Sequence, residues 1–538
     1  VSIAAVPKWK LIGPSNIGGR ITDIEMPRNN DTTIYAASAS GGIFASTNFG
    51  ATWLPIFDKQ TALAIGDIEI DPNNDSIIYA GTGEIFAGSF NNPGDGFSPY
   101  GLLGAGVFNS TDGGLTWNQL SSTNPTVCPA PTTPASCPWL YVNRLAISPN
   151  GNTILAATGN NIQRSVNAGA SWTVAGGVVG TFLDIDFHPT NNQQAIAGSN
   201  GSAVFSTNGG ATWQFANFNP AIIGRVELAY APSNPTIVYA SVDQNFGDVY
   251  RSTDGGQNYT RVNTGTNFFL QPGPPPSSQG NYDNIIWVNP QDATLIIVGG
   301  IDLWRSTNSG ATFTQISQWQ SAPGSSAHAD QHMIVAHPGF NNTTNRIAYF
   351  SNDGGLYRAD DASTVVQTRG WTNLNNNLGV TQFYGGAGNG TSGTIIGGAQ
   401  DNGNVRFRGG TGTWVSITGM GGDGGYCAAD PTDPNILYGE YVYLQIGRSN
   451  DGGVVGGSIF NGITDAGNPA AANFIAPFIL DPNNSNTMLA GGLSLWRSNN
   501  VKSFIPAPTW TAVPKPNPNS SLISAIAVSP STSTIVAV

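Results

Sequence analysis

An eight-residue motif recurs along this chain and constrains its fold more than any other feature of the sequence. The first copy, at residues 46–53, reads Ser-Thr-Asn-Phe-Gly-Ala-Thr-Trp, and every copy keeps the pattern Ser-x-Asp/Asn-x-Gly with an aromatic residue at the eighth position. The other copies begin at residues 110, 165, 206, 252 and 306. Intervals of about 40–60 residues between copies are typical of a propeller or a solenoid.

The residue types of the motif predict a tight hairpin turn. Asp or Asn accepts hydrogen bonds from backbone N–H groups of its own turn, glycine supplies a positive φ angle, and the serine hydroxyl can close the same turn. The terminal aromatic residue begins the next strand and buries a large apolar face. We therefore expect the motif to stabilise the rim of each repeat rather than to bind a ligand.

A second repeat predicts two successive strands in each unit. An apolar strand ends in proline, a polar turn follows and another apolar strand begins, as in residues 68–72 and 78–81. Proline suits a strand end because it cannot donate to a hydrogen-bond ladder. About eleven such starts occur along the chain, which exceeds the range of about four to eight blades that is usual for one propeller.

The two repeats together predict an all-β fold built of four-stranded blades. We expect a first propeller of about seven blades over residues 1–385, and a second over residues 386–538 that is truncated at its C-terminus. A single ring of about ten blades is the alternative.

The composition is that of an extracellular β protein. Charged residues make up 10% of the chain, the net charge is −12 and the isoelectric point is about 4.6, so nucleic acid is not an expected partner. No run of about 18 apolar residues is present, and we expect no transmembrane segment. Cys128 and Cys137 flank a proline-rich loop, where a disulfide would indicate an oxidising compartment. Cys427 lies in an apolar strand and is expected to be a core residue.

Candidate sites lie where the chain departs from the repeat. A long insertion after residue 83 contains Glu84, Asp95 and Tyr100. A carboxylate beside an aromatic loop could bind a sugar or Ca²⁺, and the alternative that we favour is a packed loop at the rim.

A histidine-rich segment is the second departure. At alternating positions of a strand, His328, Asp330 and His332 would point to one face. That arrangement could hold a metal such as Zn²⁺. We expect instead a hydrogen-bonded cluster at the mouth of the axial channel, and we expect no cofactor.

Three arginines form the third candidate group. Arg20, Arg144 and Arg225 each stand near the start of an innermost strand, where they could clamp a carboxylate ligand. We favour the interpretation that they pair with acids of neighbouring blades, such as Asp23 or Glu227.

Glycine-rich loops and unassigned tryptophans complete the candidate set. Asp353, Asp401 and Asp423 lie in loops where glycines let the backbone approach a ligand closely. Most of the 13 tryptophans fall on repeat positions, and Trp139 and Trp319 are among the few left as free faces for a ligand.

Several short motifs resemble those of a broad group of secreted bacterial proteins. They are Gly-Gly-Arg at 18–20, Ser-Gly-Gly at 40–42, His-x-Asp-x-His at 328–332 and Gln-Asp-Asn-Gly at 400–403. With the eight-residue motif, they are similar to the Asp-box (bacterial neuraminidase, BNR) propellers of the sortilin-like and glycoside hydrolase family 74-like group. The resemblance implies a β-propeller over nearly the whole chain, and a sortilin-like relationship would suit the single ring. The family 74 xyloglucanases of this group cleave β-glucan chains between two propellers, with two aspartates as acid and base.

The resemblance to xyloglucanases can be followed to one catalytic position. Their first blade carries Tyr-Ala-Arg-Thr-Asp-x-Gly-Gly with a catalytic aspartate, and residues 35–42 here read Tyr-Ala-Ala-Ser-Ala-Ser-Gly-Gly. Ala39 therefore stands where the resemblance implies a carboxylate. A methyl group cannot transfer a proton, so one member of the carboxylate pair is missing.

We therefore expect a secreted or cell-surface binding or adhesion module for glycan or protein ligands. The alternative is a polysaccharide hydrolase of the β-glucan or xyloglucan type that uses Asp401, Asp423 or Glu84 in the cleft between propellers. In either case a structural Ca²⁺ or another metal remains an open alternative to the absence of a cofactor.

Overall fold

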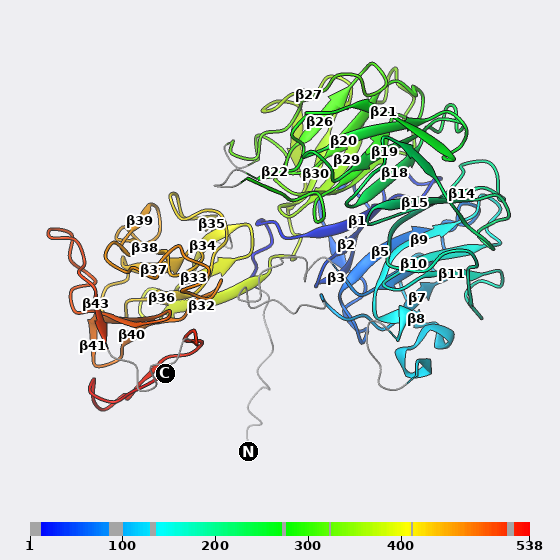
Figure 1. The fold of residues 1–538 in the computed structure, drawn as a ribbon. Helices are drawn as coiled ribbons and strands as arrows, with labels where there is room; N and C mark the ends of the chain where they lie inside the picture. Colours follow the sequence, from blue (N-terminus) through cyan, green and yellow to red (C-terminus); the bar gives the residue numbers. More distant parts are fainter. Residues whose placement is uncertain are drawn as a thin grey trace. The chain divides into compact units, whose positions relative to one another are not determined.

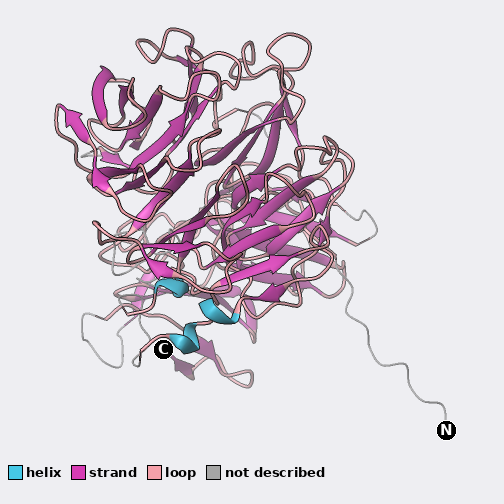
Figure 2. Cartoon of the chain, turned by 90° about the vertical axis from the view of Figure 1, so that its right-hand side faces the viewer, coloured by secondary structure: helices cyan, strands magenta, loops and turns pink. Residues whose placement is uncertain are grey.

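The computed structural model describes residues 12–85, 101–129, 136–271, 276–321, 324–409, 413–513 and 521–538. Strands dominate, and the helices within these described ranges are short 3₁₀ turns at Ser121–Thr123, Pro125–Val127 and Pro138–Leu140 (Figure 2). No helix in these ranges has the length and apolar character to cross a membrane. The predicted all-β class is confirmed, whereas Asp95 and Tyr100 lie outside the described residues.

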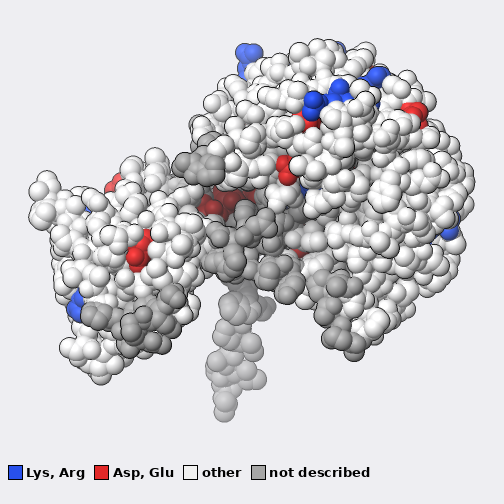
Figure 3. Space-filling view, viewed as in Figure 1, with Lys and Arg blue, Asp and Glu red and all other residues white. Residues whose placement is uncertain are grey.

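The chain forms two compact units. The larger unit takes its described residues from positions 19–376, and the smaller unit takes them from positions 12–18 and 377–538. Charged side chains are sparse on the visible face of the molecule (Figure 3). This agrees with a chain in which only 10% of residues are charged.

The described residues of the larger unit hold seven antiparallel sheets of four successive strands (Figure 1). They are β1–β4 (Ile21–Glu25, Ile34–Ser38, Gly42–Ser46, Leu54–Pro55), β5–β8 (Ile65–Ile70, Ile78–Thr82, Val107–Ser110, Asn118–Gln119), β9–β12 (Val142–Ile147, Ile154–Thr158, Ile162–Ser165, Thr173–Val174), β13–β16 (Phe182–Phe187, Ala195–Ser199, Ser202–Ser206, Gln214–Phe215), β18–β21 (Val226–Tyr230, Val238–Val242, Asp248–Ser252, Asn258–Asn263), β24–β27 (Ile285–Val288, Ile296–Gly299, Leu303–Ser306, Thr314–Gln315) and β28–β31 (Gln331–Ala336, Ala348–Asn352, Gly355–Ala359, Trp371–Asn373). The short β17 (Asn217–Asn219) adds in parallel to β21, and β22 (Leu270–Gln271) pairs with β23 (Ser277–Ser278).

The first strand of each sheet in the larger unit packs against the first strand of the next. The order of contacts is β1, β5, β9, β13, β18, β24 and β28, and β28 returns to β1. The sheets of this unit therefore form a closed ring. The indole Nε1 of Trp53 donates to the carbonyl of Leu374 at 2.8 Å and joins the first sheet to the segment after β31.

The smaller unit repeats the same sheet. Its strands are β32–β35 (Phe383–Asn389, Thr394–Ala399, Gly403–Arg408, Trp414–Ser416), β36–β39 (Cys427–Ala429, Leu437–Glu440, Ile446–Ser449, Gly456–Ser458), β40–β43 (Phe478–Asp481, Asn484–Gly491, Leu495–Ser498, Thr511–Val513) and the pair β44–β45 (Ala527–Val528, Val536–Ala537). The first strands β32, β36 and β40 again contact one another in order.

The eight-residue motif forms the predicted turn between the third and fourth strands of a sheet. In the copy at residues 110–117, the Ser110 hydroxyl accepts the Gly114 N–H at 2.8 Å, and the Asp112 carboxylate accepts the Thr116 N–H at 2.8 Å. Copies with asparagine make the same bonds, for example from Thr52 N–H to Asn48 Oδ1 at 3.0 Å.

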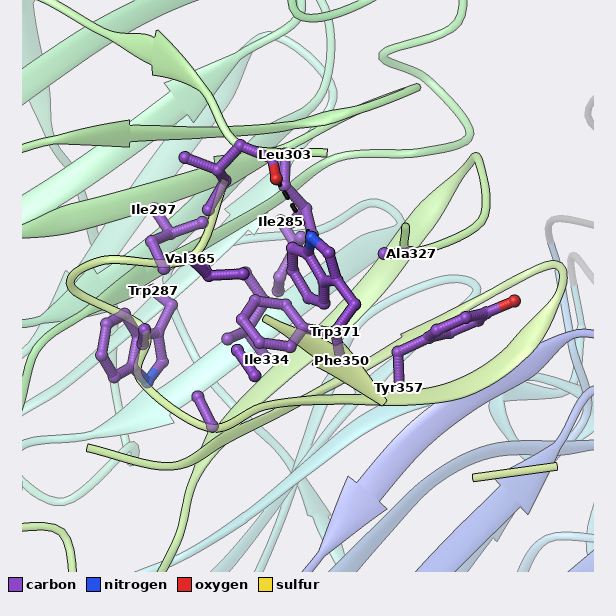
Figure 4. Packing of buried hydrophobic residues seen from close by; sticks show 14 of the residues in the cluster. Ile285, Trp287, Ile297, Leu303, Ala327, Ile334, Phe350, Tyr357, Val365 and Trp371 are labelled. Carbon is purple, nitrogen blue, oxygen red and sulfur yellow. Dashed lines mark hydrogen bonds between the residues drawn. The ribbon is translucent and has the colours of Figure 1, made fainter. Parts of the chain in front are cut away.

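Apolar faces of neighbouring sheets pack on one another to form the core. Between β24–β27 and β28–β31, side chains such as Ile297, Leu303 and Phe350 are buried around Trp371 (Figure 4). The indole of Trp371 donates to the Ile316 carbonyl at 3.2 Å, so this large ring is both buried and hydrogen-bonded.

Candidate functional site

Aspartates on three innermost strands of the larger unit, β1, β5 and β13, each bind the next sheet. One carboxylate oxygen accepts a backbone N–H from the innermost strand of the following sheet. The bonds run from Ile68 N to Asp23 Oδ2 (2.8 Å), from Leu145 N to Asp67 Oδ2 (2.7 Å) and from Leu228 N to Asp184 Oδ2 (2.8 Å). These buried carboxylates line the inner wall of the ring.

Arg144 occupies the equivalent position on β9. Leu145, whose N–H is bound by Asp67, follows Arg144 just as Ile68 follows Asp67 along its own strand. The Arg144 Nη1 lies 3.1 Å from Asp67 Oδ1 and 3.8 Å from Asp23 Oδ1. Burial raises the pKa of Asp67 to about 6, although the Arg144 charge acts in the opposite direction. One guanidinium thus compensates two buried acids.

A connected set of polar side chains lies where innermost strands begin and second strands end. Arg20 donates from Nη2 to Glu84 Oε2 at 2.9 Å and from Nη1 to the Tyr282 hydroxyl at 2.8 Å. The Tyr282 hydroxyl donates to Asp353 Oδ2, and His332 Nε2 lies 2.7 Å from Asp353 Oδ1. Burial alone would raise the pKa of Asp353, but His332, Arg20 and the Tyr282 hydroxyl hold it below its usual value.

A small hollow opens beside this network. Its polar lining comes from Thr22, Glu84, Asn143, Arg144, Arg225 and His332. Glu84 is itself buried in the ion pair with Arg20, so its carboxylate is committed to a structural contact.

Arg20 and Arg144 pair with acids of the neighbouring sheet, as interpreted, whereas Arg225 pairs with an acid of its own first strand. Arg20 pairs with Glu84, Arg144 pairs with Asp67, and Arg225 donates from Nε and Nη2 to a single Glu227 oxygen at 2.9 and 2.7 Å. All three guanidinium groups are buried.

The shared face predicted for His328, Asp330 and His332 is wrong. β28 begins at Gln331, so only His332 lies in the strand. Asp330 precedes it with a left-handed φ of 64°, which breaks the alternation of side chains. Neither histidine joins a group of converging metal ligands among the described residues. His332 instead is hydrogen-bonded to Asp353.

Two glycine-rich loops of the smaller unit bring Asp401 and Asp423 together. The backbone N–H of Asp401 donates to Asp423 Oδ1 at 3.0 Å. Tyr441 is 43% exposed, and partial burial followed by the charges of Asp423 and Asp401 raises the pKa of its phenol. A Cβ added to Gly422 would lie 2.5 Å from this ring, so only glycine lets the loop approach it. No pattern in the sequence singles out Tyr441.

The two candidate tryptophans differ in solvent exposure. Trp139 is 5% exposed and packs edge-on against Trp172, so its predicted free face is wrong. Trp319 is 49% exposed and keeps an available face. Cys128 and Cys137 are joined by a disulfide, and Cys427 packs against the core of the smaller unit.

We expect the free energy of unfolding to fall as the pH rises from 5 to 9. Burial raises the pKa of Asp186 to about 7 and that of Glu440 to about 8, and it raises that of Asp67 to about 6. In the folded protein these carboxyl groups hold protons that the unfolded chain releases near pH 4. The stability that they contribute at acid pH is therefore lost as the pH rises through their pKa values in the folded state. Urea denaturation at pH 5, 7 and 9 measures the effect. The variant Glu440→Gln should flatten the change between pH 7 and 9, and a stability that rises over this range would contradict the assignment.

The chain is similar in sequence to parts of known xyloglucanases. No family model matches the chain. The xyloglucanase Xgh74A of Acetivibrio thermocellus is 25% identical over 367 residues, which cover 60% of this chain and 41% of that protein. A xyloglucanase of Hypocrea jecorina (strain QM6a) is 29% identical over 153 residues, which cover 23% of this chain and 17% of that protein. The chain spans less than half the length of the curated relatives that it matches.

Comparison with solved structures identifies the fold. The GH74 enzyme of Niastella koreensis superposes with a TM-score of 0.51 at 17% identity, over 93% of this chain and 86% of that one. An ancestral GH74 enzyme gives a TM-score of 0.52 at 16% identity, over 95% of this chain and 78% of that one. The predicted architecture of four-stranded propeller blades is therefore confirmed, and the chain has the fold of GH74 propeller enzymes.

Proposed function

We propose that this protein binds a neutral polysaccharide of the β-glucan or xyloglucan type on the loops of Asp401, Asp423 and Tyr441, and hydrolyses it there. The observation that most supports this proposal is that the half-exposed Tyr441 and the carboxylates of Asp423 and Asp401 belong to one unit. An aromatic face stacks on the apolar face of a sugar, and carboxylates accept hydrogen bonds from sugar hydroxyls. The names of the sequence relatives support the substrate class.

Asp423 is the candidate for proton transfer. Its carboxylate is oriented by the Asp401 N–H, and it is half-buried next to Tyr441. A glycosidase needs an acid that protonates the leaving oxygen and a base or nucleophile on the other side of the sugar ring. Asp401 belongs to the same pair of loops and is the second candidate carboxylate.

The second candidate function is glycan binding without hydrolysis. In this case the protein would be a binding module that is secreted or displayed on a cell surface. Ala39 favours it. This residue is buried directly after β2, and its N–H donates to the Arg20 carbonyl at 3.1 Å. The position where the resemblance implies a catalytic carboxylate therefore holds a packed methyl group.

Replacing Asp423 by Asn should lower the release of reducing sugar from xyloglucan or β-glucan by at least about 100-fold, because general acid–base catalysis contributes about that much. Asp451→Asn is the matched control. Asp451 closes a turn of the recurring type, with its carboxylate accepting the Val454 N–H at 2.9 Å, and asparagine fills the equivalent position in other copies.

Binding measured by affinity electrophoresis in gels containing xyloglucan separates the two functions. Tyr441→Ala should weaken binding by about tenfold, or about 1.4 kcal/mol, whereas Tyr441→Phe keeps the ring and should bind normally. Binding without release of sugar would select the non-catalytic function. A wild-type protein that neither binds nor cleaves these glycans would refute the proposal.

A further inference from the structure

The hollow beside the polar network is built by the larger unit. Its lining residues fall between positions 22 and 332, whereas Asp401, Asp423 and Tyr441, which carry the proposed function, belong to the smaller unit. The cavity has a volume of about 20 Å³, which is room for about one water-sized group. It can therefore admit one end of a small molecule, but not a whole sugar ring.

β-Bulges on four innermost strands build the lining. In each of them two residues stand opposite one residue of the second strand, and the extra residues are Thr22 in β1, Gly66 in β5, Asn143 in β9 and His332 in β28. All four line the hollow. A bulge turns a side chain out of the regular alternation of a strand and is common beside functional sites. The backbone irregularities therefore gather at this one cavity.

The charges of the lining are already balanced. Each charged side chain has an opposite charge within 3.1 Å, in the pairs Arg144 with Asp67, Arg225 with Glu227 and Glu84 with Arg20. A charged ligand would bring an unpaired charge into a buried site, which is costly. The hollow therefore favours a neutral ligand.

Two lining residues keep polar groups that no described residue satisfies. Arg144 donates from Nη1 to Asp67 Oδ1 at 3.1 Å and from Nη2 to the His332 carbonyl at 3.3 Å, whereas a guanidinium has five N–H groups. The His332 imidazole meets Asp353 through Nε2 at 2.7 Å, and its Nδ1 makes no hydrogen bond within the described ranges. Since Asp353 is not part of the lining, Nδ1 is the polar atom of this ring that is left for a ligand.

A hydroxyl group matches both residues at once. Its oxygen accepts a hydrogen bond from an Arg144 N–H, and its hydrogen is donated to Nδ1 of a neutral imidazole. If the imidazole is protonated, the same oxygen accepts from Nδ1–H instead. The Arg144 guanidinium already contacts the His332 carbonyl, so one small group can lie against both residues.

We propose that this hollow binds the hydroxyl-bearing end of a small neutral polyol or monosaccharide, held between Arg144 and His332. The site is separate from the loops of the proposed function and does not depend on hydrolysis. Because few ligand atoms make contact, we expect a dissociation constant on the order of 1–10 mM.

A ligand-observed NMR titration of the whole chain tests the chemistry of the site. Glycerol and glucose should each show saturable binding. Glycerate and aminopropanediol have nearly the size of glycerol but add a negative or a positive charge, and each should bind at least about tenfold more weakly. Tighter binding of either charged compound than of glycerol would overturn the proposal.

Two variants locate the site. His332→Gln keeps an N–H for Asp353 but removes Nδ1, and Arg144→Lys keeps a cation beside Asp67 but removes the other guanidinium N–H groups. Each should weaken the binding of glycerol by about tenfold. The matched control His188→Gln replaces a half-buried histidine of the same unit that does not line the hollow, and it should bind normally. Thermal melts of the variants check that the fold is kept.

Tyr441→Ala separates this site from the proposed function. It should keep the binding of glycerol, because Tyr441 belongs to the other unit, even if the binding of polysaccharide is lost. Loss of glycerol binding in this variant, or normal binding in folded His332→Gln and Arg144→Lys, would place the ligand elsewhere and refute the proposal. The absence of saturable binding to the wild type would show that the hollow holds water only.

Discussion

Replacing Arg144 by Met is expected to lower the free energy of unfolding by about 3–5 kcal/mol, because removing one partner leaves buried charges uncompensated. The guanidinium pairs with Asp67 and approaches Asp23, and both acids are also bound to backbone N–H groups that hold sheets together. Urea denaturation at pH 7 measures the loss. The loss should shrink at pH 5, where the raised pKa of Asp67, about 6, lets it take up a proton.

Arg358→Met is the matched control. Arg358 forms an ion pair with Asp360 at 2.8 Å in which the side chains are 26% and 63% exposed. Exposed pairs contribute about 0–1 kcal/mol, so this variant should unfold close to the wild type. Equal effects of the two substitutions would show that Arg144 does not compensate the buried acids.

Replacing Trp53 by Ala is expected to cost about 3–5 kcal/mol through the cavity that it leaves. The indole is 1% exposed and its Nε1 donates to the Leu374 carbonyl, so the variant also loses a bond that closes the ring. Trp53→Phe keeps an apolar ring without the donor and should cost less. Trp319→Ala removes a half-exposed indole as the control. A thermal melt of Trp53→Ala that matches the wild type would contradict a closed ring.

The fold could be predicted because its signals are local. The eight-residue motif specifies its own turn through bonds within five residues, as Ser110 and Asp112 show. Proline at the strand end marks where pairing stops, as Pro72 does after β5. Such patterns need no information from distant parts of the chain, so they can be recognised in the sequence.

The errors concern positions whose environment is set by distant residues. Trp139 matches no repeat position, but it is buried against Trp172 of the next sheet. The alternation assumed for residues 328–332 fails because Asp330 has a left-handed backbone just before β28. Contacts between sheets decide both outcomes, and a pattern within one segment does not contain them.

The most informative site residues were missed for the same reason. Tyr441 is one tyrosine among 16, and only the fold brings it beside Asp401 and Asp423. Tyr282 joins Arg20 to Asp353 across 262 and 71 positions of the sequence. Acid partners for the arginines could be predicted because a buried cation requires an acid, but the partner of Arg225 is Glu227 on its own first strand rather than an acid of a neighbouring blade.

The bond between Trp53 and Leu374 spans 321 positions of the chain, and this has a consequence for biosynthesis. A chain emerges from the ribosome N-terminus first, at about 5–20 residues per second. The first sheet is therefore made well before the last one exists, and the edge that β1 presents to β28 stays uncovered for that interval. The larger unit can accumulate sheets during translation, but it can acquire its final cooperativity only after residue 374 has left the ribosome.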